Sequence, residues 1–183
     1  MYRLSNDCSI LAVANQNEGD SILTEGAVTL VTNFRADGGP TVKSIRLGKF
    51  DDAYLLGRDV HMPLTRNSMK DWDAAMPELG WSSTGGLLEK YSTSLVVDPE
   101  FLAFNDDGSE LYLNLQHNSA LARIATSTGE VMAIDGYGLK AMPAGVDIVD
   151  DGECKLVTSD CLFLGRTPDG IATVEYEGTC LVT

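Results

Sequence analysis

The pattern of residues 101–134 constrains the fold of this chain more than any other feature. Short apolar stretches alternate there with polar turns. The stretches are 101–105, 111–115, 121–125 and 131–134, and the turns are Asn105-Asp-Asp-Gly108, His117-Asn-Ser119 and Ser127-Thr-Gly129. Apolar stretches of this length between such turns are typical of β-strands joined as hairpins. The pattern therefore predicts a four-stranded antiparallel meander.

Further strand signals lie on both sides of this meander. They cover 9–15, 26–33 and 41–47 before it, and 145–149, 155–157, 161–164, 171–174 and 180–183 after it. Repeated meanders are typical of propeller blades, because small twisted sheets stack radially on one another. We expect an all-β fold, an incomplete β-propeller in a single domain 1–183. Its parts would be blade-like segments 9–47 and 95–137, an insertion 48–94 and a partial blade 143–183.

The insertion 48–94 differs in composition from the strand-rich segments. Residues 67–77 predict a short helix with Asn67 or Ser68 as cap and Pro77 as stop, and we expect loop elsewhere in the insertion. Large apolar side chains concentrate here, notably Trp72, Trp81, Met69 and Met76. They either cap the sheets as a satellite cluster or form a surface that faces a protein partner.

The charge balance bears on the classes of partner. The chain has 13 Lys and Arg against 27 Asp and Glu, a formal net charge of −14. Such a chain repels phosphate backbones, so we do not expect nucleic acid as a partner. No apolar window approaches the roughly 18 residues of a spanning helix, so direct membrane insertion is not expected either. The first eight residues lack the apolar run of a signal peptide, which predicts a cytosolic start or the edge of a processed or truncated chain.

The four cysteines leave the redox compartment open. Cys8, Cys154, Cys161 and Cys180 form no Cys-x-x-Cys pair. One disulfide among the last three is expected in an oxidising compartment, and free thiols are expected otherwise.

Three segments resemble a known family. Residues 98–124 begin with Asp98-Pro-Glu100, pass through an Asp-Gly turn and reach a Gln116-x-Asn118-x-Ala120 step. This arrangement resembles the blade signature of the choice-of-anchor I, or mesenchyme-specific cell-surface glycoprotein, family. Residues 11–20 are similar to that family's Ala-Asn-Glu-Gly-Asp box, and residues 168–174 are similar to the strand before a second box.

The resemblance implies a propeller at the cell surface or outside the cell. The chain departs from the family pattern by inserting Gln16 into the first box and by placing His117 where an acidic residue is usual. It stops at Thr183, where the second box would begin. We therefore expect a fragment of a longer polypeptide, or a reduced descendant that buries its exposed sheet faces against other chains.

Acidic residues suggest a candidate metal site. Glu18, Asp20 and Glu25 lie on one expected loop, and Asp98 and Glu100 lie at the start of an inner strand. If these residues converge near a propeller axis, they supply the oxygen ligands that calcium requires, as in phytases. Alternatively, Asp98 and Glu100 accept hydrogen bonds from backbone donors, and the loop acids are solvated.

Catalytic motifs are sparse. The only histidines are His61 and His117, which we interpret as surface or hydrogen-bonded residues, and no Gly-x-Ser-x-Gly motif is present. We expect a non-catalytic binding or assembly module that docks onto a protein partner or onto the remaining propeller blades. The alternatives are a calcium-dependent, phytase-like phosphoester hydrolase and an extracellular adhesion segment.

Overall fold

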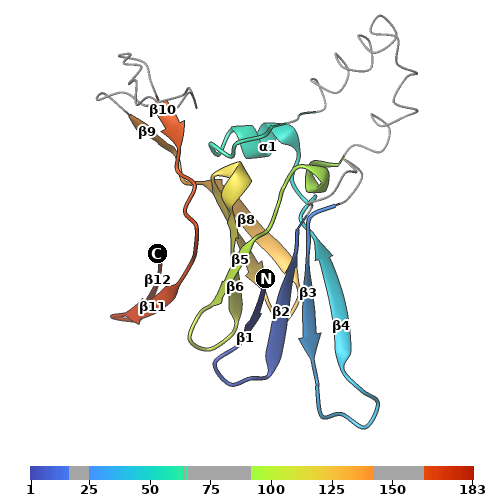
Figure 1. Cartoon of the computed structure of the whole chain (residues 1–183). Helices are drawn as coiled ribbons and strands as arrows, with labels where there is room; N and C mark the ends of the chain where they lie inside the picture. The colour runs from blue at the N-terminus through green and yellow to red at the C-terminus, as the bar shows by residue number, and fades with distance from the viewer. Residues whose placement is uncertain (17–24, 64, 66–91, 142–162) are drawn as a thin grey trace, which may run out of the picture.

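Two four-stranded antiparallel sheets form the body of the protein (Figure 1). The computed structural model describes residues 1–16, 25–63, 65, 92–141 and 163–183. Sheet A contains β1 (Tyr2–Leu4), β2 (Ile10–Asn15), β3 (Ala27–Thr32) and β4 (Thr41–Arg46), in that spatial order. Sheet B contains β5 (Phe101–Phe104), β6 (Glu110–Leu115), β7 (Ala120–Ala125) and β8 (Glu130–Gly136), also in chain order. The expected all-β fold of antiparallel meanders is confirmed, and the strands within the described ranges do not close into a ring.

Two smaller strand pairs follow sheet B. β9 (Leu139–Ala141) pairs with β10 (Phe163–Gly165), and β11 (Thr173–Tyr176) pairs with β12 (Thr179–Val182). The segment before and within β11 lies against sheet B. The Asn114 side-chain amide donates to the Pro168 carbonyl at 2.5 Å, and the Thr173 hydroxyl donates to the Phe104 carbonyl at 2.5 Å. These contacts cover part of the face of sheet B that points away from sheet A.

The turn between β5 and β6 forms for local reasons. The Asn105 side-chain oxygen accepts the Glu110 N–H at 2.9 Å, and the Asp107 carboxylate accepts the Ser109 N–H at 2.8 Å. Gly108 has φ +72°, which glycine adopts without a steric penalty. The turn fixes a register in which Phe101 is opposite Asn114.

One continuous apolar core lies between the two sheets. Buried side chains alternate with less buried ones along β2 and, from Val28 onward, along β3, because neighbouring residues of a strand point to opposite faces. Sheet A contributes Ala12, Ala14, Val28, Leu30 and Ile45, and sheet B contributes Leu102, Phe104, Leu111, Leu113, Ala122, Ile124, Val131 and Ile134. Each fully buried leucine or isoleucine stabilises the fold by about 2 kcal/mol. The sheets are also joined at their edges, where the Lys49 ammonium contacts Glu130 at 2.7 Å.

The helical elements are short and lie at one end of the sheets (Figure 1). They are α1 (Asp52–Leu56), η1 (Thr93–Leu95) and η2 (Gln116–Asn118). The expectation of loop at 52–56 was wrong: the Asp51 carboxylate accepts the Tyr54 N–H at 2.8 Å and caps α1, and Leu55 is buried beneath it. The helix expected at 67–77 lies outside the described residues. No helix in the described ranges is long and apolar enough to cross a membrane.

Two of the four cysteines can be placed. Cys8 is exposed and Cys180 is half-buried, and both are free thiols. Cys180 is therefore not part of a disulfide in this structure. Cys154 and Cys161 lie outside the described residues.

Candidate functional site

Asp98, Glu100 and His117 come together at the end of sheet B. Asp98 and Glu100 immediately precede β5, and His117 lies in η2, which follows β6. The β5–β6 register explains why they meet. Continuing the pairing of Phe101 with Asn114 by three residues brings Asp98 opposite His117.

The three side chains are close enough to share a ligand. His117 Nδ1 is 3.2 Å from Asp98 Oδ2, and His117 Nε2 is 3.7 Å from Glu100 Oε1. One ligand atom from each residue lies within 4.8 Å of the others. The side chains of Asp98 and Glu100 are each 10% exposed, whereas that of His117 is 61% exposed. The arrangement therefore has a buried acidic side and an open side formed by the imidazole.

Asn118 holds this cluster in place from beneath. Its side chain is fully buried, and its oxygen accepts the Asp98 N–H at 2.9 Å. Its amide group donates to the Val96 carbonyl at 2.7 Å and to the His61 carbonyl at 3.0 Å. A buried amide with these partners fixes three chain segments relative to one another, because leaving any of the groups unpaired would cost about 1–3 kcal/mol.

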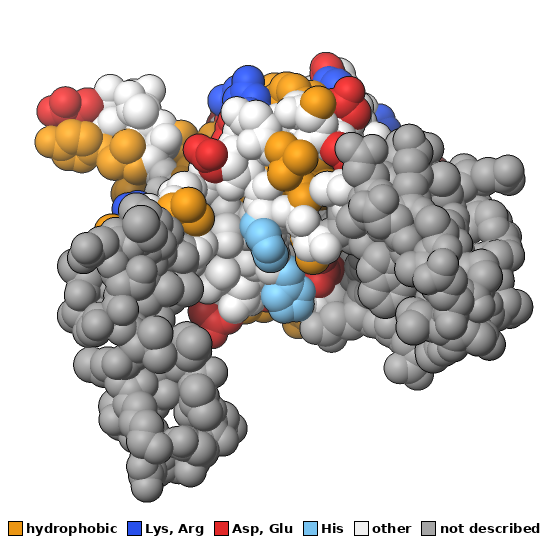
Figure 2. Space-filling view, turned by 90° about the horizontal axis from the view of Figure 1, so that it is seen from above, with side chains coloured by type: hydrophobic (Ala, Val, Ile, Leu, Met, Phe, Trp, Pro, Cys, Tyr) orange, Lys and Arg blue, Asp and Glu red, His pale blue; other side chains and the backbone are white. Residues whose placement is uncertain are grey.

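An open groove runs beside His117. It has a volume of about 880 Å³, and its lining includes His61, His117, Leu139, Gly165 and Thr167. His61 Nδ1 is 3.0 Å from the His117 carbonyl oxygen, so the two histidines flank the same hollow. Figure 2 shows this end of the molecule, with exposed histidine side chains near its middle. The groove meets the cluster at His117, the member of the cluster that lines it.

The structure brings together only part of the predicted metal set. Glu25 is not a member of this group: its carboxylate contacts Arg46 Nε at 2.8 Å and accepts a hydrogen bond from the Ser94 hydroxyl at 3.0 Å. Glu18 and Asp20 lie outside the described residues, as do Trp72, Trp81, Met69 and Met76. Sequence reasoning interpreted His117 as a surface or hydrogen-bonded histidine, which agrees with its exposure and its contact with Asp98, but it did not identify the two acids as its neighbours. The hairpin register was the signal that would have found them.

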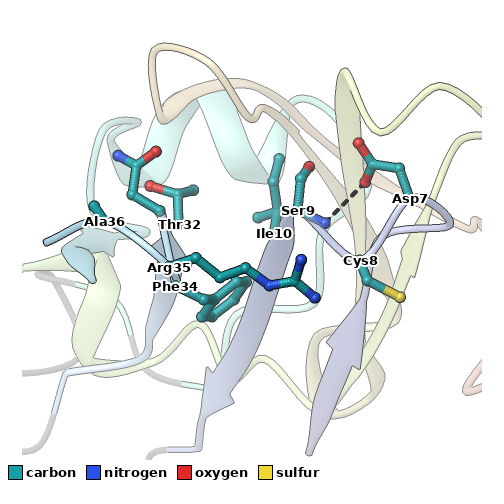
Figure 3. A pocket seen from close by; sticks show the side chains of 9 residues that line it. Asp7, Cys8, Ser9, Ile10, Thr32, Phe34, Arg35 and Ala36 are labelled. Atoms are coloured by element: carbon teal, nitrogen blue, oxygen red, sulfur yellow. Dashed lines mark hydrogen bonds between the residues drawn. The ribbon is translucent and has the colours of Figure 1, made fainter. Parts of the chain in front are cut away.

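A second hollow lies where β2 begins and β3 ends, at the other end of the sheets from His117 (Figure 3). It has a volume of about 680 Å³, and Arg35 and Phe34 from one loop face Cys8 and Ser9 from another. Asp7 at its edge accepts hydrogen bonds from the Ser5 hydroxyl at 2.7 Å and from the Ser9 N–H at 3.0 Å. These bonds, that of Ser5 above all, lower the pKa of Asp7 to about 2. The Asp7 carboxylate thus orders its own turn, which is a structural role.

Comparison with known proteins gives one finding. The family model described as the choice-of-anchor I domain matches residues 1–183, the whole chain. No match was found among curated proteins or among solved structures.

Proposed function

The chain belongs to the choice-of-anchor I domain family, which indicates a cell-surface-associated module, and from this premise we propose that it is a non-catalytic binding module of propeller type. Sheets A and B would be consecutive blades of an incomplete propeller. The outer face of sheet A would pack against an apolar β-sheet face of a protein, either a partner or further blades. The observation that carries the proposal is an apolar row across sheet A, exposed at its two ends and half-buried between them.

The row follows directly from the strand register. Leu4 is opposite Leu11, Leu11 is opposite Val31, and Val31 is opposite Val42. Residues opposite one another share a face of the sheet, so the four side chains form one line across all four strands. Val42 is 63% exposed and Leu4 is 46% exposed. Tyr2, on the same face, is 72% exposed.

The inner face of sheet A provides an example of an apolar row that is covered by another sheet. Ala12 and Leu30 form part of the next row, and both are buried against the core shared with sheet B. A pleated apolar face is complementary to another pleated apolar face at about 10 Å separation. A further β-sheet is therefore the best-fitting occupant of the outer face.

Site-specific photo-crosslinking tests this proposal in the native source. Val42→p-benzoylphenylalanine places a photoreactive group on the outer face of sheet A. We expect irradiation to yield one dominant protein adduct, with the attached peptide coming from an apolar β-strand. Mass spectrometry of that peptide identifies the occupant and shows whether it belongs to a separate chain or to the same polypeptide.

The matched control is Leu56→p-benzoylphenylalanine on α1. Leu56 is 52% exposed and apolar, like Val42, but it does not belong to sheet A. Equal adduct yields at the two positions, or no protein adduct at position 42, would overturn the proposal.

The other sequence hypotheses have less support. The phytase-like hydrolase rests on five acidic residues, of which Glu25 is engaged by Arg46 and Ser94. The adhesion hypothesis is compatible with the family assignment, and the same crosslink would identify an adhesion partner. The proposed partner contacts of Trp72, Trp81, Met69 and Met76 stay predictions.

A further inference from the structure

The cluster beside the groove combines two kinds of donor atom. Asp98 and Glu100 offer carboxylate oxygens, and His117 offers an imidazole nitrogen. Calcium in proteins is bound by six to eight oxygen ligands. Zinc and neighbouring transition metals bind imidazole nitrogen and carboxylate oxygen together. The donor set therefore favours a transition metal over the calcium that the acidic residues alone suggested.

The spacing of the donors fits a single ion after a small adjustment. Donor atoms that each lie about 2.0 Å from a tetrahedral zinc ion are roughly 3.3 Å from one another. The corresponding atoms of the cluster lie within 4.8 Å of one another. His117 is the exposed member, so its side chain has room to rotate toward an ion that binds beside the two acids.

The backbone around the two acids is already fixed. The Asp98 N–H donates to the Asn118 side chain at 2.9 Å, and the Glu100 N–H donates to the Asn114 carbonyl at 3.0 Å. An ion that binds here orders only side chains, which reduces the entropic cost of binding.

We infer that Asp98, Glu100 and His117 bind a single divalent transition-metal ion of the zinc class at the rim of the groove. The two neighbouring carboxylates attract a doubly charged metal ion more strongly than they attract the singly charged imidazolium of His117. Three protein ligands leave a fourth tetrahedral position for water or for an anionic group of a ligand. This site is distinct from the outer face of sheet A, so the inference does not depend on the proposed docking function.

Metal titration of the full chain tests the inference. After removal of metals with a chelator, Zn²⁺ binding is measured by calorimetry, and Co²⁺ binding is measured by visible absorption, which reports the coordination geometry. We expect one ion per chain, and an increase in melting temperature on adding Zn²⁺. His117→Ala should lower the Zn²⁺ affinity at least about tenfold and abolish the shift in melting temperature.

Two further variants make the test specific. Glu175→Gln removes the carboxylate of an exposed residue of β11 that is not part of the cluster, and it should leave Zn²⁺ affinity unchanged. Glu100→Gln keeps the shape of the side chain, removes its charge and should weaken binding as His117→Ala does; circular dichroism checks the fold of each variant. The inference is overturned by absence of stoichiometric Zn²⁺ binding, by unchanged affinity in His117→Ala, by an equal loss in Glu175→Gln, or by displacement of Zn²⁺ by millimolar Ca²⁺.

Discussion

Tyr137 shows how burial sets the chemistry of a single residue. It follows β8, its N–H donates to the Ser119 carbonyl at 2.7 Å, and its hydroxyl donates to the Asn114 side chain at 2.9 Å. Burial raises the pKa of Tyr137 to about 12. In the unfolded chain the pKa of a tyrosine is about 10. Folding therefore favours the protonated phenol.

This shift predicts a loss of stability at alkaline pH. The contribution of Tyr137 is fully present below about pH 10, and it is lost as the pH rises from about 10 toward 12, because the unfolded state releases the proton first. Urea denaturation between pH 8 and 12 on the wild type and on Tyr137→Phe measures the effect. We expect the difference in unfolding free energy between them to shrink across this window.

The exposed Tyr176 provides the matched control, since it is 61% exposed. The Tyr176→Phe variant should follow the wild type at every pH. A constant difference between the wild type and Tyr137→Phe from pH 8 to 12 would contradict the argument.

Gly136 lies where the end of β8 packs closely against the turn after α1. Its N–H donates to the Arg58 carbonyl at 2.8 Å, which joins the end of β8 to the turn after α1. A Cβ atom at this position would lie 2.1 Å from the Asp59 carbonyl oxygen. The clash is with backbone, so no side-chain rotation relieves it.

Gly136→Ala should therefore destabilise the protein by about 1–3 kcal/mol, because β8 and α1 must separate. Gly170→Ala is the control, since a Cβ there meets nothing within 4 Å. Urea denaturation of both variants checks the prediction. Equal midpoints for Gly136→Ala and the wild type would mean that the contact between β8 and α1 is not needed for stability.

The elements differ in how far sequence alone predicts them. The meander of sheet B was predictable because apolar alternation and the Asn105-Asp-Asp-Gly108 turn act over a few residues. β1 was missed because it has three residues, all exposed, and is defined only by its pairing with β2. α1 was missed because a five-residue helix has too few positions to show a periodic pattern, and its stability comes from the Asp51 cap and buried Leu55.

Only part of the candidate site could be predicted, because two of its residues stand out by their position in the sequence and the third depends on strand pairing. Asp98 and Glu100 attract attention as acids at the start of a strand. His117 joins them only through the β5–β6 pairing, and the contact of Asp98 with Asn118 depends on the conformation of η2. In that turn Ser119 adopts a left-handed conformation with φ 49°, which its residue type does not reveal. Contacts across a hairpin are found only after its strands have been paired in register, and the residue types alone do not give that pairing.

At the scale of the whole molecule, net charge disfavours self-association and exposed apolar surface favours it. The net charge of −14 makes copies of the chain repel, while the outer face of sheet A offers exposed apolar side chains such as Val42. Charge repulsion is screened over about 30 Å at 0.01 M salt and about 3 Å at 1 M. Apolar contacts are not weakened by added salt. When no occupant covers sheet A, the balance should therefore move toward self-association as salt rises.

We expect the purified chain to be monomeric at low salt and to associate reversibly at high salt, as measured by sedimentation velocity. Val42→Lys should keep it monomeric, because a charged side chain in the apolar row would have to be buried on association. Leu56→Lys changes the net charge by the same amount on α1 and should associate like the wild type. If the two variants associate equally, the outer face of sheet A does not mediate self-association. If Val42→Lys alone stays monomeric, the apolar row that is proposed to receive a partner sheet also mediates self-association when the partner is absent.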